Sequence, residues 1–394
     1  MAQAGSTFQP ITYTTRFPAL DGLRALAVTM VFAFHYGGGA HSGSLLRAVN
    51  AMRLQGWAGV DLFFALSGFL ITGVLYDTRG DSKYFSRFYA RRTLRIFPLY
   101  YLLALVLLLL TPLFHYGWQG LHLLFLVYLG NIPASLMPTM YQIHARYKAA
   151  DLYIGHLWTL SVEEQFYLLW PLIVWRVRSR ITLMRVAAGL SFLAILMRIW
   201  LVFGAKVDLR GGWLFTVLPF HMDSLLIGAV LALLLRGPNA AAWQRRSKWV
   251  FAAAVAAVIT AFAFNPPGFM PAVGFPLMGI ASAGLIGWVL MPGSLAFQIF
   301  HLRPIRVFGK YSYGFYVYHL PFAAAWAWLT AELGRRIHSI HLAAGIVLTV
   351  NFAFTFVVAK LSYDYFEVRF LRRKRAFEYD TEKTASPSRP YNIA

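Results

Sequence analysis

The stretch FPALDGLRALAVTMVFAFHY, residues 17–36, decides the fold, because it is long and apolar enough to cross a bilayer as one helix. Only Asp21, Arg24 and His35 in it are costly to place in lipid. Arg24 and His35 are eleven residues apart, which at ~100° per residue comes within about 20° of three full turns, so the two side chains share one face. This pattern is typical of a buried site. The alternative is a plain anchor, in which Asp21 pairs with Arg24 near the interface and His35 reaches out of the far end.

The composition is that of a polytopic membrane protein. Of 394 residues, 59% are hydrophobic and 13% are charged, and the mean hydropathy is +0.57. The net charge of +21 would favour nucleic-acid binding in a soluble chain, but here membrane topology accounts for Lys and Arg, so we expect no nucleic-acid partner. The chain has no cysteine, which excludes disulfides, thiol nucleophiles and Cys-bound metals. We expect no metal ion and no permanently bound cofactor.

Ten apolar runs are long enough to cross the membrane, and an eleventh, at 119–132, is shorter. The ten lie near residues 17–36, 57–76, 94–113, 156–175, 182–203, 213–235, 248–264, 270–291, 311–331 and 341–363. If the N-terminus is cytoplasmic and 119–132 does not cross, the cytoplasmic segments contain 25 Lys and Arg and the outer segments 8, as the positive-inside rule requires. We therefore predict an all-α bundle of about ten transmembrane helices, with both termini cytoplasmic and 119–132 re-entrant or interfacial.

We expect a single domain, since no internal repeat or long linker divides the apolar runs. Residues 1–16 form a cytoplasmic arm without the features of a cleaved signal peptide. Residues 17–367 form the membrane domain. Residues 368–394 form a basic cytoplasmic tail, which we expect to be disordered.

Ionisable side chains recur in the outer halves of the predicted spans. Asp61 lies about one turn inside its span, and His221 and Asp223 lie in the outer part of theirs. Carboxylates at such depth need partners or water. The depths of His35, Asp61, Glu163 and Asp223 predict a polar chamber that opens outward. The alternative is a set of interhelical hydrogen bonds that hold the bundle together, each contributing ~0.6 kcal/mol on average.

The span at 156–175 carries three more ionisable groups. His156 and Glu163 are seven residues apart, close to two turns, so they share a face. Glu164 points about 100° away from Glu163, so at most one of the two glutamates faces the same cavity as His35.

A basic cluster marks the cytoplasmic side. In FYARRTLRIFPLYY, Arg91 precedes Arg92 and Arg95, which are about one turn apart and suited to bidentate contacts with a phosphate or diphosphate. The alternative is anchoring to anionic membrane lipid. The segment GKYSYGFYVYHLPF, facing the same side, carries Lys310, Ser312, Tyr316 and His319.

These residues resemble a known family, the acyltransferase 3 proteins, which are integral-membrane enzymes that O-acylate sugars, polysaccharides and related acceptors. The likeness extends roughly from Phe17 to Glu367 and rests on five pieces in one order. They are LDGLRALAV with the Arg24 to His35 spacing, GVDLFFALSGFLI, RRTLRIFPLYY, LWTLSVEEQFYLLWP and KYSYGFYVYHLP. Some relatives carry a fused extracytoplasmic hydrolase-like domain, which we expect this chain to lack.

The resemblance implies a role for each matching residue. His35 matches the family's essential histidine, and Arg24 matches the basic residue paired with it. Arg92 and Arg95, with Arg91 beside them, match the pair associated with the acyl-CoA donor. The other matches are the acidic positions Asp61 and Glu163, and the penultimate-span residues Ser312, Tyr316 and His319, which we group with the donor site. The candidates for acceptor binding are His156, Glu164, His221 and Asp223, although an arginine is more usual in the family near His221.

We therefore expect transfer of an acyl group, acetyl in the first place, from cytoplasmic acyl-CoA to a hydroxyl of a carbohydrate or glycolipid acceptor at the outer half of the bacterial inner membrane. The sequence contains neither a GxSxG elbow nor an HExxH helix. Direct attack, with His35 as general base oriented by Asp61 or Glu163, is then the simplest route. The rival functions are a transporter or flippase for an anionic or glycosylated substrate, and a membrane-bound O-acyltransferase of another fold.

Overall fold

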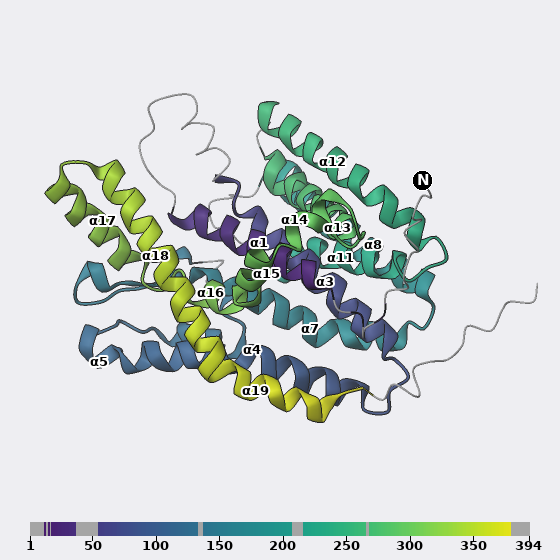
Figure 1. Cartoon of the computed structure of the whole chain (residues 1–394), viewed down its shortest axis with the longest axis horizontal. Coiled ribbons are helices and arrows are strands. Elements are labelled where there is room, and N and C mark those ends of the chain that lie inside the picture. The colour runs from purple at the N-terminus through teal and green to yellow at the C-terminus, as the bar shows by residue number, and fades with distance from the viewer. Residues whose placement is uncertain are drawn as a thin grey trace, which may run out of the picture.

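The computed structural model describes residues 12, 15, 17–36, 54–132, 137–206, 216–264 and 268–379, and over these residues the chain is largely helical (Figure 1). The longer helices are α1 (Pro18–Tyr36), α3 (Ala58–Asp77), α4 (Tyr84–Leu109), α7 (Trp158–Arg176), α8 (Arg180–Ile199), α11 (Asp223–Leu234), α12 (Ala240–Phe264), α13 (Phe275–Val289), α17 (Ala323–Ile337) and α18 (Ile340–Ser362). The shorter ones are α5 (Thr111–Phe114), α10 (Leu218–His221), α14 (Leu295–Phe300), α15 (Arg303–Lys310), α16 (Ser312–Tyr318) and α19 (Val368–Arg373).

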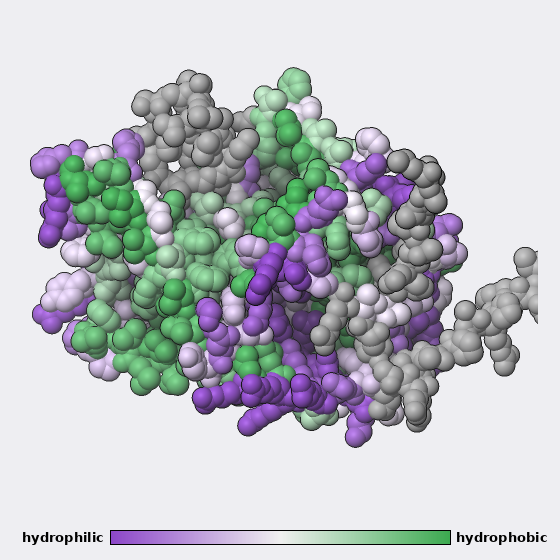
Figure 2. All heavy atoms as spheres, in the orientation of Figure 1, coloured by the Kyte–Doolittle hydropathy of each residue, from purple (hydrophilic) through white to green (hydrophobic). Residues whose placement is uncertain are grey.

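The helices have the lengths and composition of a polytopic membrane protein, which confirms the predicted fold class. In the described ranges, six helical stretches are long and apolar enough to span a bilayer. The helices α1 and α7 have 19 residues each but carry the charged groups discussed below. Figure 2 shows hydrophilic side chains gathered over α19 and hydrophobic side chains over the part that α18 crosses. The count of ten spans stays a prediction.

The short apolar run at 119–132 forms no spanning helix. Gly120–Val127 is a 3₁₀-helix of 8 residues, which at about 2.0 Å per residue extends about half of a ~30 Å bilayer core. It ends at Tyr128, whose φ of 56° breaks the helical path. This agrees with the expectation that the run does not cross the membrane.

The central helices α3 and α11 pack at very short range, because each presents a glycine to the other's backbone. A Cβ on Gly68 of α3 would lie 1.8 Å from the Leu225 carbonyl oxygen, and one on Gly228 of α11 would lie 2.1 Å from the Ala65 carbonyl oxygen. Such small-residue contacts let membrane helices approach closely. This contact joins two buried apolar clusters, one extending to α4, α7 and α16 and the other to α13.

Replacing Gly68 by Val is therefore expected to force α3 and α11 apart and to lower the free energy of unfolding by about 1–3 kcal/mol, the usual range for overpacking. The measurement is the midpoint of thermal unfolding of the purified protein in detergent. Gly189→Val in α8 is the matched control, because a Cβ at Gly189 would meet nothing within 4 Å. An equal loss in both variants would contradict the close-packing explanation.

The predicted span at 311–331 is broken between α16 and α17. Pro321 stands in the break and has no N–H to donate to the Val317 carbonyl four residues earlier. That carbonyl instead accepts a hydrogen bond from His156 Nε2 at 3.1 Å. The break also leaves His319 immediately after the last residue of α16. The rings of His156 and His319 lie 5.0 Å apart, centroid to centroid, at this break.

A small hairpin lies between α5 and α7, where strand β1 (Gln142–Ile143) pairs antiparallel with β2 (Leu152–Tyr153). The Asp151 carboxylate accepts hydrogen bonds from the Ala145 N–H at 2.8 Å and from Gln142 Nε2 at 2.9 Å. Although burial raises the pKa of Asp151, these bonds and the neighbouring His144 lower it below its usual value. The carboxylate therefore holds the hairpin in its ionised form.

Candidate functional site

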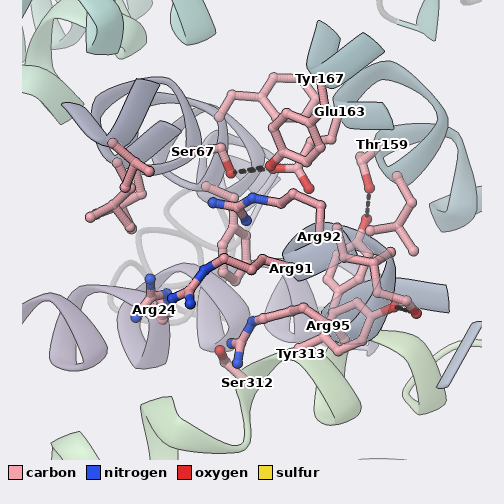
Figure 3. A pocket seen from close by; sticks show the side chains of 18 of the residues that line it. Arg24, Ser67, Arg91, Arg92, Arg95, Thr159, Glu163, Tyr167, Ser312 and Tyr313 are labelled. Carbon is pink, nitrogen blue, oxygen red and sulfur yellow. Dashed lines mark hydrogen bonds between the residues drawn. The ribbon is translucent and has the colours of Figure 1, made fainter. Parts of the chain in front are cut away.

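A cavity of about 300 Å³ lies between α3, α4, α7 and α16, and Lys374 and Tyr379 form part of its wall (Figure 3). Much of its lining is apolar. The cations that line it are Arg24, Arg91, Arg92, Arg95 and Lys374. Within the described chain, Glu163 is the one carboxylate in this lining. The cavity is therefore suited to a ligand that is strongly anionic and has an apolar part.

The helix α4 supplies three of these cations. The guanidinium groups of Arg91, Arg92 and Arg95 gather with that of Arg24 on one side of the cavity (Figure 3). Arg92 lies over the ring of Tyr167, 5.2 Å from its centroid. The sequence grouped Arg91, Arg92 and Arg95 together, and the structure does place them together. It adds Arg24, which the resemblance had paired with His35 instead.

Arg24 also forms an ion pair with Asp21. This is the contact that the plain-anchor alternative predicted, but it does not take Arg24 out of the cavity, since the same side chain belongs to the lining. The two interpretations of this residue are therefore not exclusive.

The segment after α19 closes the cavity on one side. Arg91 Nη1 donates to the carbonyl oxygens of Lys374 and Phe377, each at 3.4 Å, and its guanidinium lies 5.5 Å from the centroid of the Tyr379 ring. Sequence analysis assigned this segment to a disordered tail, and the structure describes it through Tyr379 as packed against α4. In the sequence, only the run of basic residues that begins at Arg369 indicated that this segment contributes to a basic cavity.

The two adjacent glutamates of α7 point to different places. Glu163 faces the cavity, where its carboxylate accepts a hydrogen bond from the Ser67 hydroxyl at 2.5 Å, and Tyr167 donates to the same hydroxyl oxygen at 3.0 Å. Glu164 is absent from the lining, and its Oε1 is buried without a hydrogen-bond partner in the described chain. The two glutamates therefore diverge as their adjacent positions predict, but the cavity that Glu163 faces is not lined by His35.

A cluster of three histidines lies close to the cavity but outside its lining. His35 Nδ1 is 3.1 Å from His319 Nε2, and the His319 ring centroid is 5.0 Å from that of His35 and 5.0 Å from that of His156. His156 and His319 are buried, whereas His35 is exposed. Tyr316 links cluster and cavity: its side chain belongs to the lining, and its hydroxyl contacts Thr159 Oγ1 at 2.7 Å and the His156 carbonyl at 2.8 Å.

The three residues of the penultimate span that were predicted to belong to the donor site do not all lie in the cavity. Ser312 and Tyr316 line the basic cavity, but His319 does not and contacts His35 instead. His156, predicted to bind acceptor, belongs to the same histidine cluster.

The predicted outward chamber of His35, Asp61, Glu163 and Asp223 is not what the structure has, because Asp61 and Asp223 face other helices. Asp61 Oδ1 accepts from Ser224 Oγ at 2.5 Å and lies 3.2 Å from His221 Nε2. On α3, Asp61 is six residues from Ser67, which lines the cavity, and six steps of ~100° put the two on different faces. Neither Asp61 nor Glu163 contacts His35 in the described chain, so the expected orienting carboxylate is absent there.

Asp223 is held by an arginine that sequence analysis missed. Arg198 of α8 pairs with it through Nη2 at 2.5 Å and Nη1 at 3.2 Å, and both side chains are fully buried. An arginine thus does lie near His221, supplied by a different helix. The position of Arg198 inside the apolar span 182–203 was the available signal, because a charge within a span requires a buried partner.

The other residues missed are Ser67, Thr159 and Tyr167 in the cavity and Lys374 and Tyr379 in its wall. They are uncharged or lie in the tail, so residue type and depth did not single them out. Among the described residues, no group of three or more His, Asp or Glu is arranged to hold a metal ion.

The fold and the site define an integral-membrane protein with a basic cavity inside a helical bundle and a histidine cluster close to that cavity. A family model described as an acyltransferase domain matches residues 17–360, and the chain belongs to this acyltransferase family.

The chain is similar to three curated bacterial proteins. It is 28% identical to the peptidoglycan O-acetyltransferase OatA of Listeria monocytogenes, over 90% of this chain and 56% of the relative. It is 27% identical to the putative peptidoglycan O-acetyltransferase YrhL of Bacillus subtilis, over 89% and 54%, and 25% identical to the O-acetyltransferase OatA of Staphylococcus aureus, over 93% and 59%. The chain therefore spans a little over half the length of these relatives. No solved structure matches it.

Proposed function

We propose that this protein is a membrane O-acyltransferase that moves an acyl group, acetyl in the first place, from acyl-CoA to a hydroxyl of a carbohydrate or glycoconjugate. The donor would enter from the cytoplasmic side of a bacterial inner membrane, and the acceptor would be engaged at the outer half. The observation that carries the proposal is the group of five cations in a cavity whose wall at Tyr316 adjoins the histidine cluster. Family membership and the names of the relatives agree with acetyl transfer.

The charges of the cavity support acyl-CoA as the donor. CoA carries a diphosphate and a phosphate monoester at one end and an uncharged pantetheine arm at the other. Arg91, Arg92, Arg95 and Lys374 would bind the phosphates through charge-assisted hydrogen bonds. The arm would extend along the apolar part of the lining toward Thr159 and Tyr316.

His35 supports the acceptor half of the proposal, because it is an exposed imidazole in contact with buried polar groups. Its Nε2 would take the proton of the acceptor hydroxyl while that oxygen attacks the thioester carbonyl. The carbon–sulfur bond then breaks, the CoA thiolate takes the proton from the His35 imidazolium and leaves as the thiol, and the acyl group remains on the acceptor as an ester. No covalent acyl-enzyme is needed, in keeping with a chain that has no cysteine.

His35 itself does not line the cavity, so the reaction needs a connection between the two. The Tyr316 hydroxyl, bonded to Thr159 and to the His156 carbonyl, stands at the junction. In the proposed reaction this hydroxyl moves aside when the donor is bound, and the thioester passes it to meet the acceptor.

The direct test is the formation of an acetyl ester by the purified protein. Detergent-solubilised protein is mixed with isotopically labelled acetyl-CoA and a panel of glycans, including peptidoglycan fragments, and the products are analysed by mass spectrometry. We expect labelled acetyl on one of the acceptors together with stoichiometric free CoA. A carrier protein consumes no acetyl-CoA, so unchanged donor in every mixture would reject the enzymatic function in favour of transport.

A further inference from the structure

His319 makes two hydrogen-bonding contacts through its two ring nitrogens. Its Nδ1 lies 2.6 Å from the Tyr316 carbonyl oxygen, and its Nε2 lies 3.1 Å from His35 Nδ1. The side chain is 1% exposed, and the Tyr36 hydroxyl donates to its carbonyl oxygen. His319 is therefore fixed both by its own backbone and by the helix that carries His35.

These contacts decide which nitrogens carry protons, because a carbonyl oxygen only accepts. His319 Nδ1 must be protonated to donate to Tyr316, which leaves the lone pair on His319 Nε2 in the neutral ring. His35 Nδ1 lies 3.0 Å from the Val31 carbonyl and faces that lone pair, so it carries the proton and donates to both acceptors. The lone pair of His35 is thereby assigned to Nε2.

The remaining nitrogen is the one that a general base needs. His35 Nε2 has no hydrogen-bond partner among the residues that the structure describes, and the side chain is exposed. A base with its lone pair turned to an open side can accept a proton from a bound hydroxyl. The other tautomer would direct the lone pair toward Val31 and His319, where no substrate reaches it.

We propose that His319 is the positioning residue of His35: it fixes the tautomer and ring orientation that aim Nε2 at the acceptor hydroxyl. This rests on the proposed function and refines it. Sequence analysis assigned this task to Asp61 or Glu163. A neutral imidazole differs from a carboxylate because it adds no negative charge to stabilise the imidazolium of His35. Its contribution is therefore orientation, as in other catalytic histidines whose second nitrogen is held by a partner.

The local sequence explains why His319 is available for this contact. Pro321 ends α16 and frees the Val317 carbonyl, which His156 then binds at 3.1 Å. The His156 ring lies 5.0 Å from the His319 ring, centroid to centroid. The titratable groups described around the His35 and His319 pair are thus His156, Tyr36 and Tyr316, and none of them is a carboxylate.

The test compares His319→Ala with His319→Gln in the purified full chain. We expect His319→Ala to lower kcat about 10²-fold, as misplacement of a catalytic group does, with the KM for acetyl-CoA within about twofold of the original. Gln places an amide oxygen where it accepts from His35 Nδ1, so His319→Gln should recover part of the lost kcat. His122→Ala, at a buried histidine of the 3₁₀-helix Gly120–Val127, controls for the loss of a buried ring.

Three results would overturn the proposal. The first is an unchanged kcat in His319→Ala. The second is a loss of kcat that is equal in the Ala and Gln variants and accompanied by an equal rise in the KM for acetyl-CoA, which would place His319 in the donor site. The third is an unmodified chain that transfers no acetyl group; this would refute the proposed function as well, and it is distinguished from the other two because they require an active unmodified enzyme.

Discussion

Replacing His35 by Ala is expected to reduce acyl transfer by about 10²–10⁴-fold, the usual contribution of a general base. The side chain is exposed, and its described hydrogen bonds are those to Val31 and His319, so its loss should leave the bundle folded. The measurement is kcat for labelled acetyl transfer in the presence of saturating acetyl-CoA, with thermal unfolding as the check on folding.

A matched control keeps the composition and moves only the imidazole. Exchanging Phe34 and His35 turns the histidine by ~100° on α1, away from His319. This variant should insert and unfold like the original and yet be inactive. If it, or His35→Ala, retained transfer near the original rate, His35 could not be the base.

Replacing Arg92 and Arg95 together by Gln is expected to raise the KM for acetyl-CoA by about 10²–10⁴-fold. The reason is that each charge-assisted hydrogen bond to a phosphate contributes about 1.5–3 kcal/mol. The KM for the acceptor should change little. Because KM also depends on chemistry, the dissociation constant of CoA itself is measured by calorimetry in the same variant.

The control for this variant is Arg245→Gln with Arg246→Gln, two exposed arginines of α12 that lie outside the cavity. Their loss removes the same charge without touching the cavity, so donor affinity should stay near the original. Equal increases in donor and acceptor KM in the Arg92 and Arg95 variant would contradict a donor role for the α4 arginines.

The sequence predicts the features of a site residue that depend on its own helix. It does not predict which residues of other helices that residue contacts. Length and periodicity alone predict the helix over 17–36, the one-turn spacing that groups Arg92 with Arg95, and the divergence of Glu163 from Glu164. Periodicity predicts the face of a helix on which a residue lies, but it does not predict which other helix packs against that face. Asp61 was therefore expected beside His35, and it meets His221 and Ser224 instead.

The contacts around His319 and Arg198 depend on helices that are distant in the sequence. His319 and His35 are 284 positions apart, and Asp223 and Arg198 belong to different helices. The sequence predicts how deep each ionisable side chain lies in the membrane, but several side chains at a similar depth could be its partner. The partner that each side chain meets depends on tertiary features such as the close packing of α3 against α11 and the break at Pro321.

In the proposed reaction, an acyl donor bound on one side of the membrane transfers its acyl group to an acceptor on the other side. The most direct measurement uses proteoliposomes of known protein orientation that enclose labelled acetyl-CoA and have the glycan acceptor only outside. In vesicles whose enclosed side is the one bearing Lys374 and the α4 arginines, we predict labelled ester on the external glycan at a rate that His35→Ala abolishes. Transfer that occurs only when donor and acceptor share one compartment would contradict the account.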